Sequence, residues 1–254
     1  MSEDFKEAFE KTKIAGSIAA GALDEVDKII KPGISTDQID SICYEYINDH
    51  KAYSAPLFYR GFPKSCCTSA NHVVCHGIPS SKILREGDIV NVDVTALKDG
   101  WHGDTSRMFK IGNVSIKAEK LVNTTYESLM KAISIIKNGV HLGDIGSTIQ
   151  THVEAHGFSV VQDFCGHGIG KKFHKEPNVL HYGEKGTGEK VKTGMIFTIE
   201  PMINFGNYET KTLNDGWTAV TKDKSLSAQF EHTIGVTKNG CEVFTKSKNI
   251  DETL

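Results

Sequence analysis

The chain of 254 residues carries 29 Lys and Arg against 32 Asp and Glu, a formal net charge of −3. With 39% hydrophobic residues and a mean hydropathy of −0.28, this composition excludes a disordered or membrane-embedded chain and indicates one globular domain, residues 1–254. Lys and Arg are scattered rather than gathered in a stripe, which argues against nucleic acid as a partner.

The N-terminal segment has acids and lysines in every apolar stretch, so it predicts neither a signal peptide nor a membrane span, and we expect a cytosolic protein. No CxxC pair occurs and two cysteines are adjacent, so we expect reduced thiols at Cys43, Cys66, Cys67, Cys75, Cys165 and Cys241. A free cysteine is usually a small buried hydrophobic residue, and we expect this role here. The alternative is that Cys67 or Cys75 is reactive.

Two helices are predicted at the start of the chain. Helix formers continue to about Ile30, where Lys31-Pro32-Gly33 is a stop signal. Ser35-Thr36 is typical of a helix start. After it, apolar residues recur at the spacing of one helical face, at Ile39, Ile42, Cys43, Tyr46 and Ile47.

Between Cys66 and Gly112 the character changes to β, and the run DIVNVDVTALKDGWHGDTSRMFKIG at 88–112 alternates, breaks at Asp99-Gly100 and resumes, which predicts a β-hairpin. Helical spacing then returns twice, with one stripe ending at Asn138-Gly139 and another at Gly157. The remainder consists of strand-like segments and glycine-punctuated loops.

The element order is therefore two helices and then strands, followed by the same again. We predict an α+β fold in which two similar halves, about 1–112 and 113–254, pack helices on one face of a largely antiparallel sheet. No residue-level repeat is visible, so the two halves are inferred from element order alone.

An acidic residue stands in the first strand of the predicted hairpin. Val90, Val92 and Val94 point to one face, so Asp93 points to the other. Aspartate is disfavoured within strands, and a carboxylate removed from water needs a charged partner or a metal. Asp93 is thus a candidate metal ligand.

Asp104 lies in the returning strand, where the hairpin can bring it close to Asp93. A divalent cation or a shared proton between the two carboxylates would remove their repulsion. The alternative is a solvated turn aspartate that pairs with Arg107.

Further candidates lie in the second half. The run FCGHGIGKKFH holds His167, a candidate ligand, and His174, a candidate catalytic group, although each could be structural. Glu200 and Glu231 stand in apolar, strand-like segments. One imidazole with four carboxylates suits a pair of first-row divalent cations better than a structural zinc.

Six strings carry a resemblance that extends over nearly the whole chain: CHGIP at 75–79, NVDVTALKDGWHGDTSRMF, CGHGIGKKFHKEP, FTIEPMI, DGWTAVTKD and SAQFEHTIGVT. In these strings the chain resembles the methionine aminopeptidases of the M24 metallopeptidases, specifically the short bacterial type I form. The resemblance implies the pita-bread fold with internal pseudo-twofold symmetry, and the removal of initiator methionine before a small second residue.

The resemblance also implies roles for individual residues. The metal ligands would be Asp93, Asp104, His167, Glu200 and Glu231, with Asp104 and Glu231 bridging two cations of cobalt, manganese, iron, zinc or nickel. Residues on the substrate side would be His76 and His174, and the methionine pocket would consist of Tyr59, Phe62, Cys67, Phe173 and Trp217. A sodium or potassium ion would be held at Asn71, Val73 and Ser227.

The implied mechanism is hydrolysis by a hydroxide that two cations generate from a shared water, while the substrate's α-amine ligates one cation. Glu200 would act as general base, His174 would stabilise the tetrahedral oxygen, and His76 would contact the scissile nitrogen. The implied partners are the N-termini of nascent polypeptides, and the implied oligomeric state is a monomer. A transient contact with the ribosome is a further possible partner interaction, which some relatives make through N-terminal extensions.

Three rivals share this scaffold. A proline-directed peptidase would need a large extra N-terminal domain for which 254 residues leave no room. A catalytically dead binding module would not need all five ligands and both histidines. A metal-free relative of the creatine hydrolases would have to bury these carboxylates without a cation, which is costly.

Overall fold

The computed structural model describes residues 3–248 and begins with the two predicted helices, α1 (Glu3–Ile29) and α2 (Thr36–Asp49). A capping box starts α2, because the Ser35 hydroxyl accepts from the Gln38 backbone N–H and the Gln38 side chain accepts from that of Ser35. Both helices are confirmed where the sequence placed them.

The predicted hairpin is also confirmed, as β4 (Ile89–Lys98) and β5 (Trp101–Lys110). The two residues between the strands, Asp99 and Gly100, have φ angles of 49° and 81°. Positive φ at both central positions is what a two-residue turn needs to match the twist of the strands.

Two further helices follow, α3 (Ile116–Ser134) and α4 (Leu142–Ala155), again in agreement with the sequence pattern. The remaining elements are short: β1 (Tyr53–Ser54), a 3-10 turn (Tyr59–Gly61), β2 (Cys67–Ala70), β3 (Val73–Cys75), β6 (Ser159–Val160), β7 (Gly166–Gly168), β8 (Lys175–Val179), β9 (Ile196–Ile199), β10 (Met202–Asn204), β11 (Thr210–Thr212), β12 (Ala219–Thr221), β13 (Ser227–Gln229), β14 (Glu231–Val236) and β15 (Cys241–Val243).

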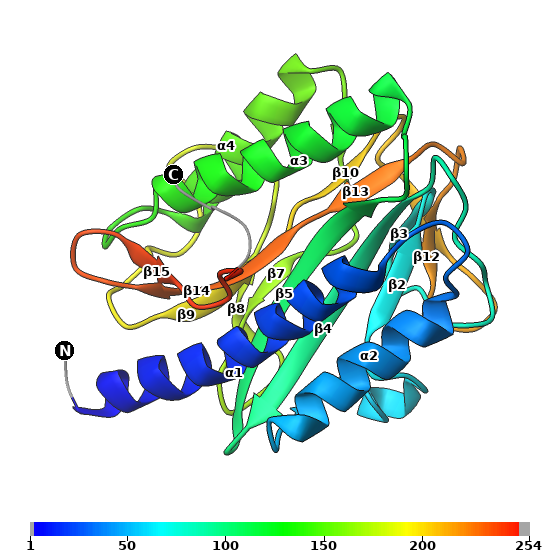
Figure 1. Ribbon diagram of the computed structural model, residues 1–254. Helices are drawn as coiled ribbons and strands as arrows, with labels where there is room; N and C mark the ends of the chain where they lie inside the picture. The colour runs from blue at the N-terminus through cyan, green and yellow to red at the C-terminus, as the bar shows by residue number, and fades with distance from the viewer. Residues whose placement is uncertain (1–2, 249–254) are drawn as a thin grey trace.

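The main sheet is antiparallel, with strand order β1-β4-β5-β14-β9-β7-β8, β2 added beside β4 and β15 beside β14. Helices α1 and α2 cover β4 and β5, while α3 and α4 cover the strands of the second half (Figure 1). The valines of β4 lie in the core under α1 and α2, and a second core lies under α3 and α4. This confirms the α+β class with helices packed on an antiparallel sheet.

The register of this sheet joins the two halves of the chain. Strand β5 pairs with β14, so that Glu231 stands opposite Ser106 and His232 opposite Thr105. Residues more than one hundred positions apart in sequence therefore share one face of the sheet.

Arg107 forms a buried ion pair that ties α1 to the sheet. Its Nη2 donates to Asp24 Oδ1 at 3.0 Å, and the Ser247 hydroxyl donates to the same oxygen at 2.6 Å. The alternative in which Arg107 pairs with a solvated Asp104 is therefore wrong, since Asp104 is buried.

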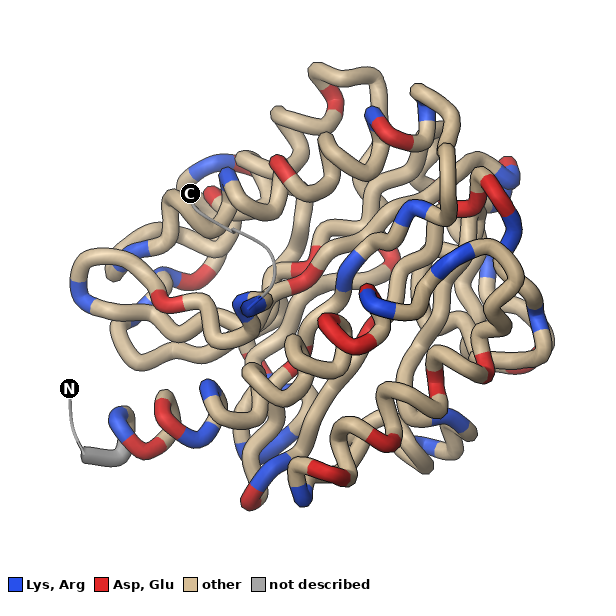
Figure 2. The backbone as a smooth tube through the Cα atoms, viewed as in Figure 1, with Lys and Arg blue, Asp and Glu red and all other residues tan. Residues whose placement is uncertain are grey.

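Charged side chains are interspersed along the backbone, with Lys and Arg next to Asp and Glu in most regions of Figure 2. Within residues 3–248, no helix is long and apolar enough to cross a bilayer.

Two glycines allow close backbone contacts of helix α1, Gly103 with β5 and Gly16 with the segment that follows β15. A Cβ on Gly103 would lie 2.2 Å from the backbone N of Gly16, and a Cβ on Gly16 would lie 2.7 Å from the carbonyl oxygen of Phe244. Neither neighbour is a side chain that could rotate away, so both positions need glycine.

Replacing Gly103 with Ala is expected to lower the free energy of unfolding by about 1–3 kcal/mol, because the helix must move off the sheet. Gly240→Ala is the matched control, since its new Cβ would meet only the Ile136 oxygen at 3.9 Å. The control should change stability by less than about 0.5 kcal/mol. Urea unfolding followed by circular dichroism measures both, and equal losses would contradict the close-packing account.

Candidate metal centre and substrate cavity

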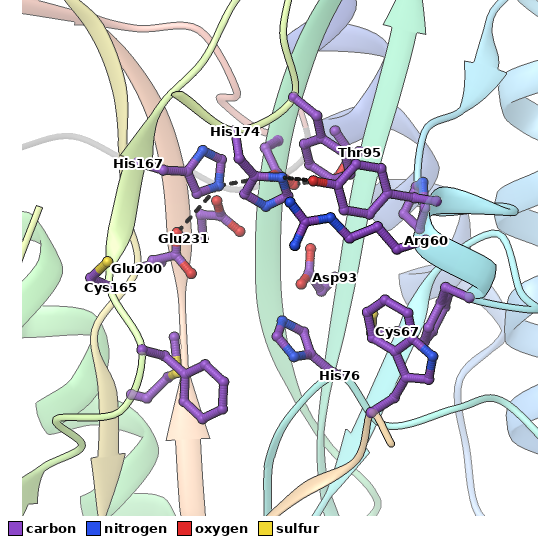
Figure 3. A pocket seen from close by; sticks show the side chains of 18 of the residues that line it. Arg60, Cys67, His76, Asp93, Thr95, Cys165, His167, His174, Glu200 and Glu231 are labelled. Carbon is purple, nitrogen blue, oxygen red and sulfur yellow. Dashed lines mark hydrogen bonds and ion pairs between the residues drawn. The ribbon is translucent and has the colours of Figure 1, made fainter. Parts of the chain in front are cut away.

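A cavity of about 450 Å³ opens on the sheet face opposite the valines of β4 (Figure 3). Its lining includes all five predicted ligands, both predicted histidines and the whole predicted methionine pocket: Asp93, Asp104, His167, Glu200, Glu231, His76, His174, Tyr59, Phe62, Cys67, Phe173 and Trp217. The structure thus gathers these twelve residues from across the chain into one site.

The hairpin places the two aspartates. Thr95 stands opposite Asp104, and Asp93 stands opposite Ser106, so the two carboxylates are diagonal neighbours on one face. The Thr95 hydroxyl donates to Asp104 Oδ1 at 2.6 Å, which fixes the orientation of that carboxylate.

Glu231 begins β14, directly after the break that separates it from β13. Its pairing with Ser106 of β5 brings it beside the aspartates. Its Oε1 is buried and has no hydrogen-bond partner in the described residues. A buried carboxylate oxygen without a partner is costly, and a cation would provide the missing ligand.

Glu200 follows β9 and is held by polar neighbours on three sides. Thr198, two residues earlier on the same strand face, donates to Glu200 Oε1 at 2.8 Å, and Gln229 Nε2 lies 3.4 Å from Oε2. The backbone N–H of Glu200 donates to His181 Nε2 at 3.1 Å. These contacts position the carboxylate over the cavity.

His167 is the central residue of β7, and its imidazole faces the carboxylates (Figure 3). Nε2 lies 3.6 Å from both Asp104 Oδ2 and Glu200 Oε1, while Nδ1 lies 3.2 Å from the Gly168 carbonyl oxygen. With Nδ1–H donating to that carbonyl, Nε2 presents a free lone pair to the site, as in metal-ligating histidines.

The glycines around His167 make room for neighbouring strands. A Cβ on Gly166 would lie 2.4 Å from the Thr198 oxygen, and one on Gly168 would lie 2.2 Å from the Glu176 oxygen. These glycines let β7 insert between β8 and β9.

The electrostatics of the cavity favour a cation. Burial raises the pKa of Asp93 to about 7 and that of Glu200 to about 8. Burial, followed by repulsion from Asp93, raises the pKa of Asp104, and burial with repulsion from Asp104 does the same for Glu231. No Lys or Arg of residues 3–248 forms an ion pair with them. The residues present therefore fit divalent metal ions, which would replace the protons that the carboxylates otherwise hold.

Ligand atoms of Asp104, His167 and Glu231 all lie within 4.8 Å of one another. A set of carboxylate oxygens with a single imidazole nitrogen is typical of first-row divalent cations such as manganese, iron and cobalt.

One wall of the cavity is formed by His174 and the aromatic rings next to it. His174 Nδ1 lies 3.1 Å from the Tyr59 hydroxyl, and its ring centroid lies 4.2 Å from that of His167. Burial, with His167 next in importance, lowers the pKa of His174 to about 3. His174 is therefore a neutral imidazole that can donate from Nε2 when Tyr59 donates to Nδ1.

The opposite wall is apolar. Phe62 meets Trp217 edge to face at 5.2 Å between centroids, and His76 meets Phe164 in the same way at 5.4 Å. His76 has a φ of 56°, a costly conformation for a residue other than glycine that is typical of functional sites.

Cys67 lies buried in the cavity lining between these walls, and burial followed by repulsion from Asp93 raises the pKa of its thiol well above the usual value. Burial also raises the pKa of Cys75. All six cysteines are free thiols, as expected, and the reactive reading of these two is not favoured because a reactive cysteine needs a lowered pKa.

The three residues predicted to hold a monovalent cation lie outside the cavity lining. The Ser227 N–H donates to the Asn71 carbonyl oxygen at 2.8 Å, and Val73 lies on β3, which contacts β13. The Asn71 side chain binds Asp88 and the Ile89 N–H. The structure thus brings Asn71 and Ser227 together.

The residues that orient the candidate ligands were not predicted from the sequence. Thr95 and Thr198 could have been found from period two, since each lies two residues from a predicted ligand on the same strand face. His181 and Arg60, which lines the cavity mouth, carried no local signal.

Comparison with known proteins agrees with this geometry. Residues 10–238 match the model of metallopeptidase family M24. The methionine aminopeptidase of Rickettsia prowazekii is 55% identical over 96% of this chain and 95% of its own, and that of Escherichia coli K12 is 54% identical over 98% and 94%. The chain belongs to the M24 metallopeptidases, and among them to the methionine aminopeptidases.

Solved methionine aminopeptidases share the fold closely. The Rickettsia prowazekii crystal structure superposes with a TM-score of 0.94 and covers 95% of this chain and 98% of its own. The crystal structure of methionine aminopeptidase from Thermotoga maritima is 41% identical in sequence and superposes with a TM-score of 0.93. The match covers 95% of this chain and 97% of that chain. The curled antiparallel sheet with its outer helices is therefore the pita-bread fold of the M24 metallopeptidases, as the sequence predicted.

Loading the chelator-treated protein with Mn²⁺ near pH 7 is expected to release about one proton or more per chain, because Glu200 and part of Asp93 are protonated before the metal binds. Isothermal titration calorimetry in two buffers with different ionisation enthalpies counts the protons. Glu200→Gln should release fewer. A heat of binding that is identical in the two buffers would contradict the raised pKa values.

Proposed function

We propose that this chain is a metal-dependent aminopeptidase that removes the initiator methionine from newly made polypeptides. The observation that carries the proposal is the convergence in a single cavity of one imidazole, three buried carboxylates, the partly buried carboxylate of Asp93 and an aromatic wall. Membership of the methionine aminopeptidases supports the same substrate.

The metal centre would consist of two divalent cations held by Asp93, Asp104, His167, Glu200 and Glu231. The family resemblance implies that Asp104 and Glu231 would each contact both cations, and the proposal is supported by their ligand atoms, which lie within 4.8 Å of each other and of His167. When bound, such a pair lowers the pKa of a water, polarises the scissile carbonyl and offers a ligand position to the substrate's α-amine.

The protein's own groups would carry the protons. Glu200 would accept a proton from the attacking water and deliver it to the leaving amine, because Thr198 and the His181-bound backbone hold its carboxylate at the cavity surface. His174 would donate its Nε2–H to the oxygen that becomes negative in the tetrahedral species. His76, on the other wall, would contact the scissile nitrogen.

The apolar wall would bind the methionine side chain. Trp217 and Phe62 line the cavity and contact each other edge to face, and a thioether gains from sulfur contacts with aromatic rings. Tyr59, Phe173 and Cys67 complete the proposed pocket. A small residue in the second position is the preference that the family resemblance implies.

We further propose that the chain acts as a monomeric single catalytic domain on nascent polypeptides in the cytoplasm, with contact to the ribosome during this step. A sodium or potassium ion at Asn71, Val73 and Ser227 belongs to the same proposal, supported by the hydrogen bond that brings Ser227 to the Asn71 carbonyl.

The substrate is tested by stripping the protein with chelator, restoring single metals, and comparing release of methionine from Met-Ala-Ser with release of an amino acid from an Xaa-Pro peptide. Turnover of the methionine peptide in the presence of manganese, cobalt or iron is expected. Turnover of the proline peptide alone would favour a proline-directed peptidase, and turnover of neither with any metal would favour a binding module.

His174→Ala is expected to lower kcat by about 10²–10³-fold while metal content stays at the wild-type value, because the proposed donor acts on the transition state. Metal analysis and steady-state kinetics on Met-Ala-Ser measure the two effects. Tyr59→Phe, which removes only the hydroxyl next to Nδ1, should lose less. A parallel loss of metal and turnover in His174→Ala would assign His174 to the ligands instead.

A further inference from the structure

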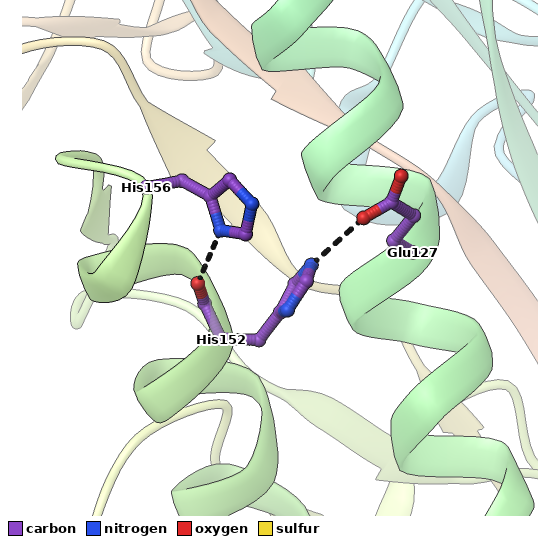
Figure 4. A group of neighbouring side chains, drawn as sticks. All are labelled: Glu127, His152 and His156. Atoms are coloured by element: carbon purple, nitrogen blue, oxygen red, sulfur yellow. Dashed lines mark hydrogen bonds and ion pairs between the residues drawn. The ribbon is translucent and has the colours of Figure 1, made fainter.

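A second group of metal-ligand side chains lies on the helical layer, away from the catalytic cavity. Glu127 of α3 faces His152 of α4 and His156 at the end of α4 (Figure 4). One ligand atom from each lies within 4.8 Å of the others, and none of the three lines the catalytic cavity.

The two imidazoles are brought together by helical spacing. His152 and His156 are four residues apart, so they share one helix face, and their ring centroids lie 4.6 Å apart. His156 Nδ1 lies 2.8 Å from the His152 carbonyl oxygen. A carbonyl accepts only, so Nδ1 carries the proton and Nε2 of His156 keeps its lone pair, on the side of the ring that faces Glu127 in Figure 4.

The spacing of the other two ligands fits a tetrahedral site. His152 Nε2 lies 3.1 Å from Glu127 Oε2. Two ligand atoms, each about 2.0–2.1 Å from a tetrahedral zinc, are about 3.3 Å apart. The side chains would therefore need only small shifts to admit a cation in place of the proton between them.

The surrounding charges are mixed. Burial lowers the pKa of His152, with His156 and Lys131 contributing, so the neutral imidazole that binds metals predominates near pH 7. Lys120 donates to the His156 carbonyl oxygen, which places a second cation near the cluster. Glu127 supplies the compensating negative charge, and its side chain is 54% exposed, leaving an open path for a metal ion.

We propose that Glu127, His152 and His156 form a second metal site that takes one zinc-like divalent ion, with zinc, copper, nickel and cobalt in the same class. Two imidazoles and one carboxylate select these metals over magnesium and calcium, which prefer oxygen ligands. Three protein ligands leave one position to water. Because the ligands come from α3 and α4, an ion bound there links the two helices that cover the second half of the sheet.

The test uses the full chain, stripped with chelator and dialysed against buffered micromolar Zn²⁺, with bound zinc counted by mass spectrometry. Glu127→Gln, His152→Ala and His156→Ala are expected to hold about one zinc fewer than the wild type. With Mn²⁺ restored to the catalytic centre, all three should release methionine from Met-Ala-Ser at the wild-type rate.

His50→Ala is the matched control. His50 ends α2 and places its Nδ1 2.8 Å from the Tyr46 carbonyl oxygen, the same contact that His156 makes, but it belongs to no candidate ligand cluster of residues 3–248. It should bind as much zinc as the wild type.

Equal zinc content in the wild type and the three variants would overturn the proposal. The contact between His152 and Glu127 would then be a hydrogen bond without a role in metal binding. So would a deficit in the control as large as theirs. Glu127→Gln keeps the test decisive if a histidine variant fails to fold, because Glu127 is half exposed. An anomalous-scattering peak between the three side chains in zinc-soaked crystals would support the site, and density for zinc at the catalytic centre alone would contradict it.

Discussion

The arrangement of this protein depends on the cost of placing four carboxylates in one cavity. Asp104, Glu200 and Glu231 are buried and Asp93 is partly buried, and none has an arginine or lysine partner in the described part of the chain. Such a cluster must bind protons or cations. The raised pKa values of the carboxylates show that they bind protons when no cation is present. The free lone pair of His167 and the unpartnered Glu231 oxygen are available to bind a cation.

The fold supports this cluster through register and close packing. The β5–β14 pairing joins ligands of the first half to those of the second, and the hydroxyls of Thr95 and Thr198 fix two carboxylates. Gly103 allows α1 to pack directly on the back of β5, and Gly16 allows α1 to pack on the backbone of Phe244. The ligand-bearing strands are thus backed by a rigid helical layer, as a preorganised site requires.

Two histidines, His167 and His156, are oriented by the same kind of hydrogen bond. At His167 and at His156, Nδ1 donates to a main-chain carbonyl, and Nε2 is left as the free nitrogen. In the cavity that nitrogen lies near the carboxylates of Asp104, Glu200 and Glu231, whereas on the helices it lies near one carboxylate and one imidazole. The number of oxygen ligands therefore distinguishes the oxygen-rich candidate centre in the cavity from the proposed site for a zinc-like ion on the helices.

The sequence alone determined the helices, the β4–β5 hairpin, the α+β class and the identity of the candidate ligands, because periodicity, capping residues and aspartates within strands are local signals. Tertiary structure decided what depends on contacts between distant segments. Only the sheet register shows Glu231 beside Asp104, and only the packing of distant segments shows the contact of His181 with Glu200 and the pairing of Arg107 with Asp24. Likewise, only the packing of α3 on α4 brings Glu127 to His152, since no pattern along a chain encodes a neighbour 25 residues away on another helix.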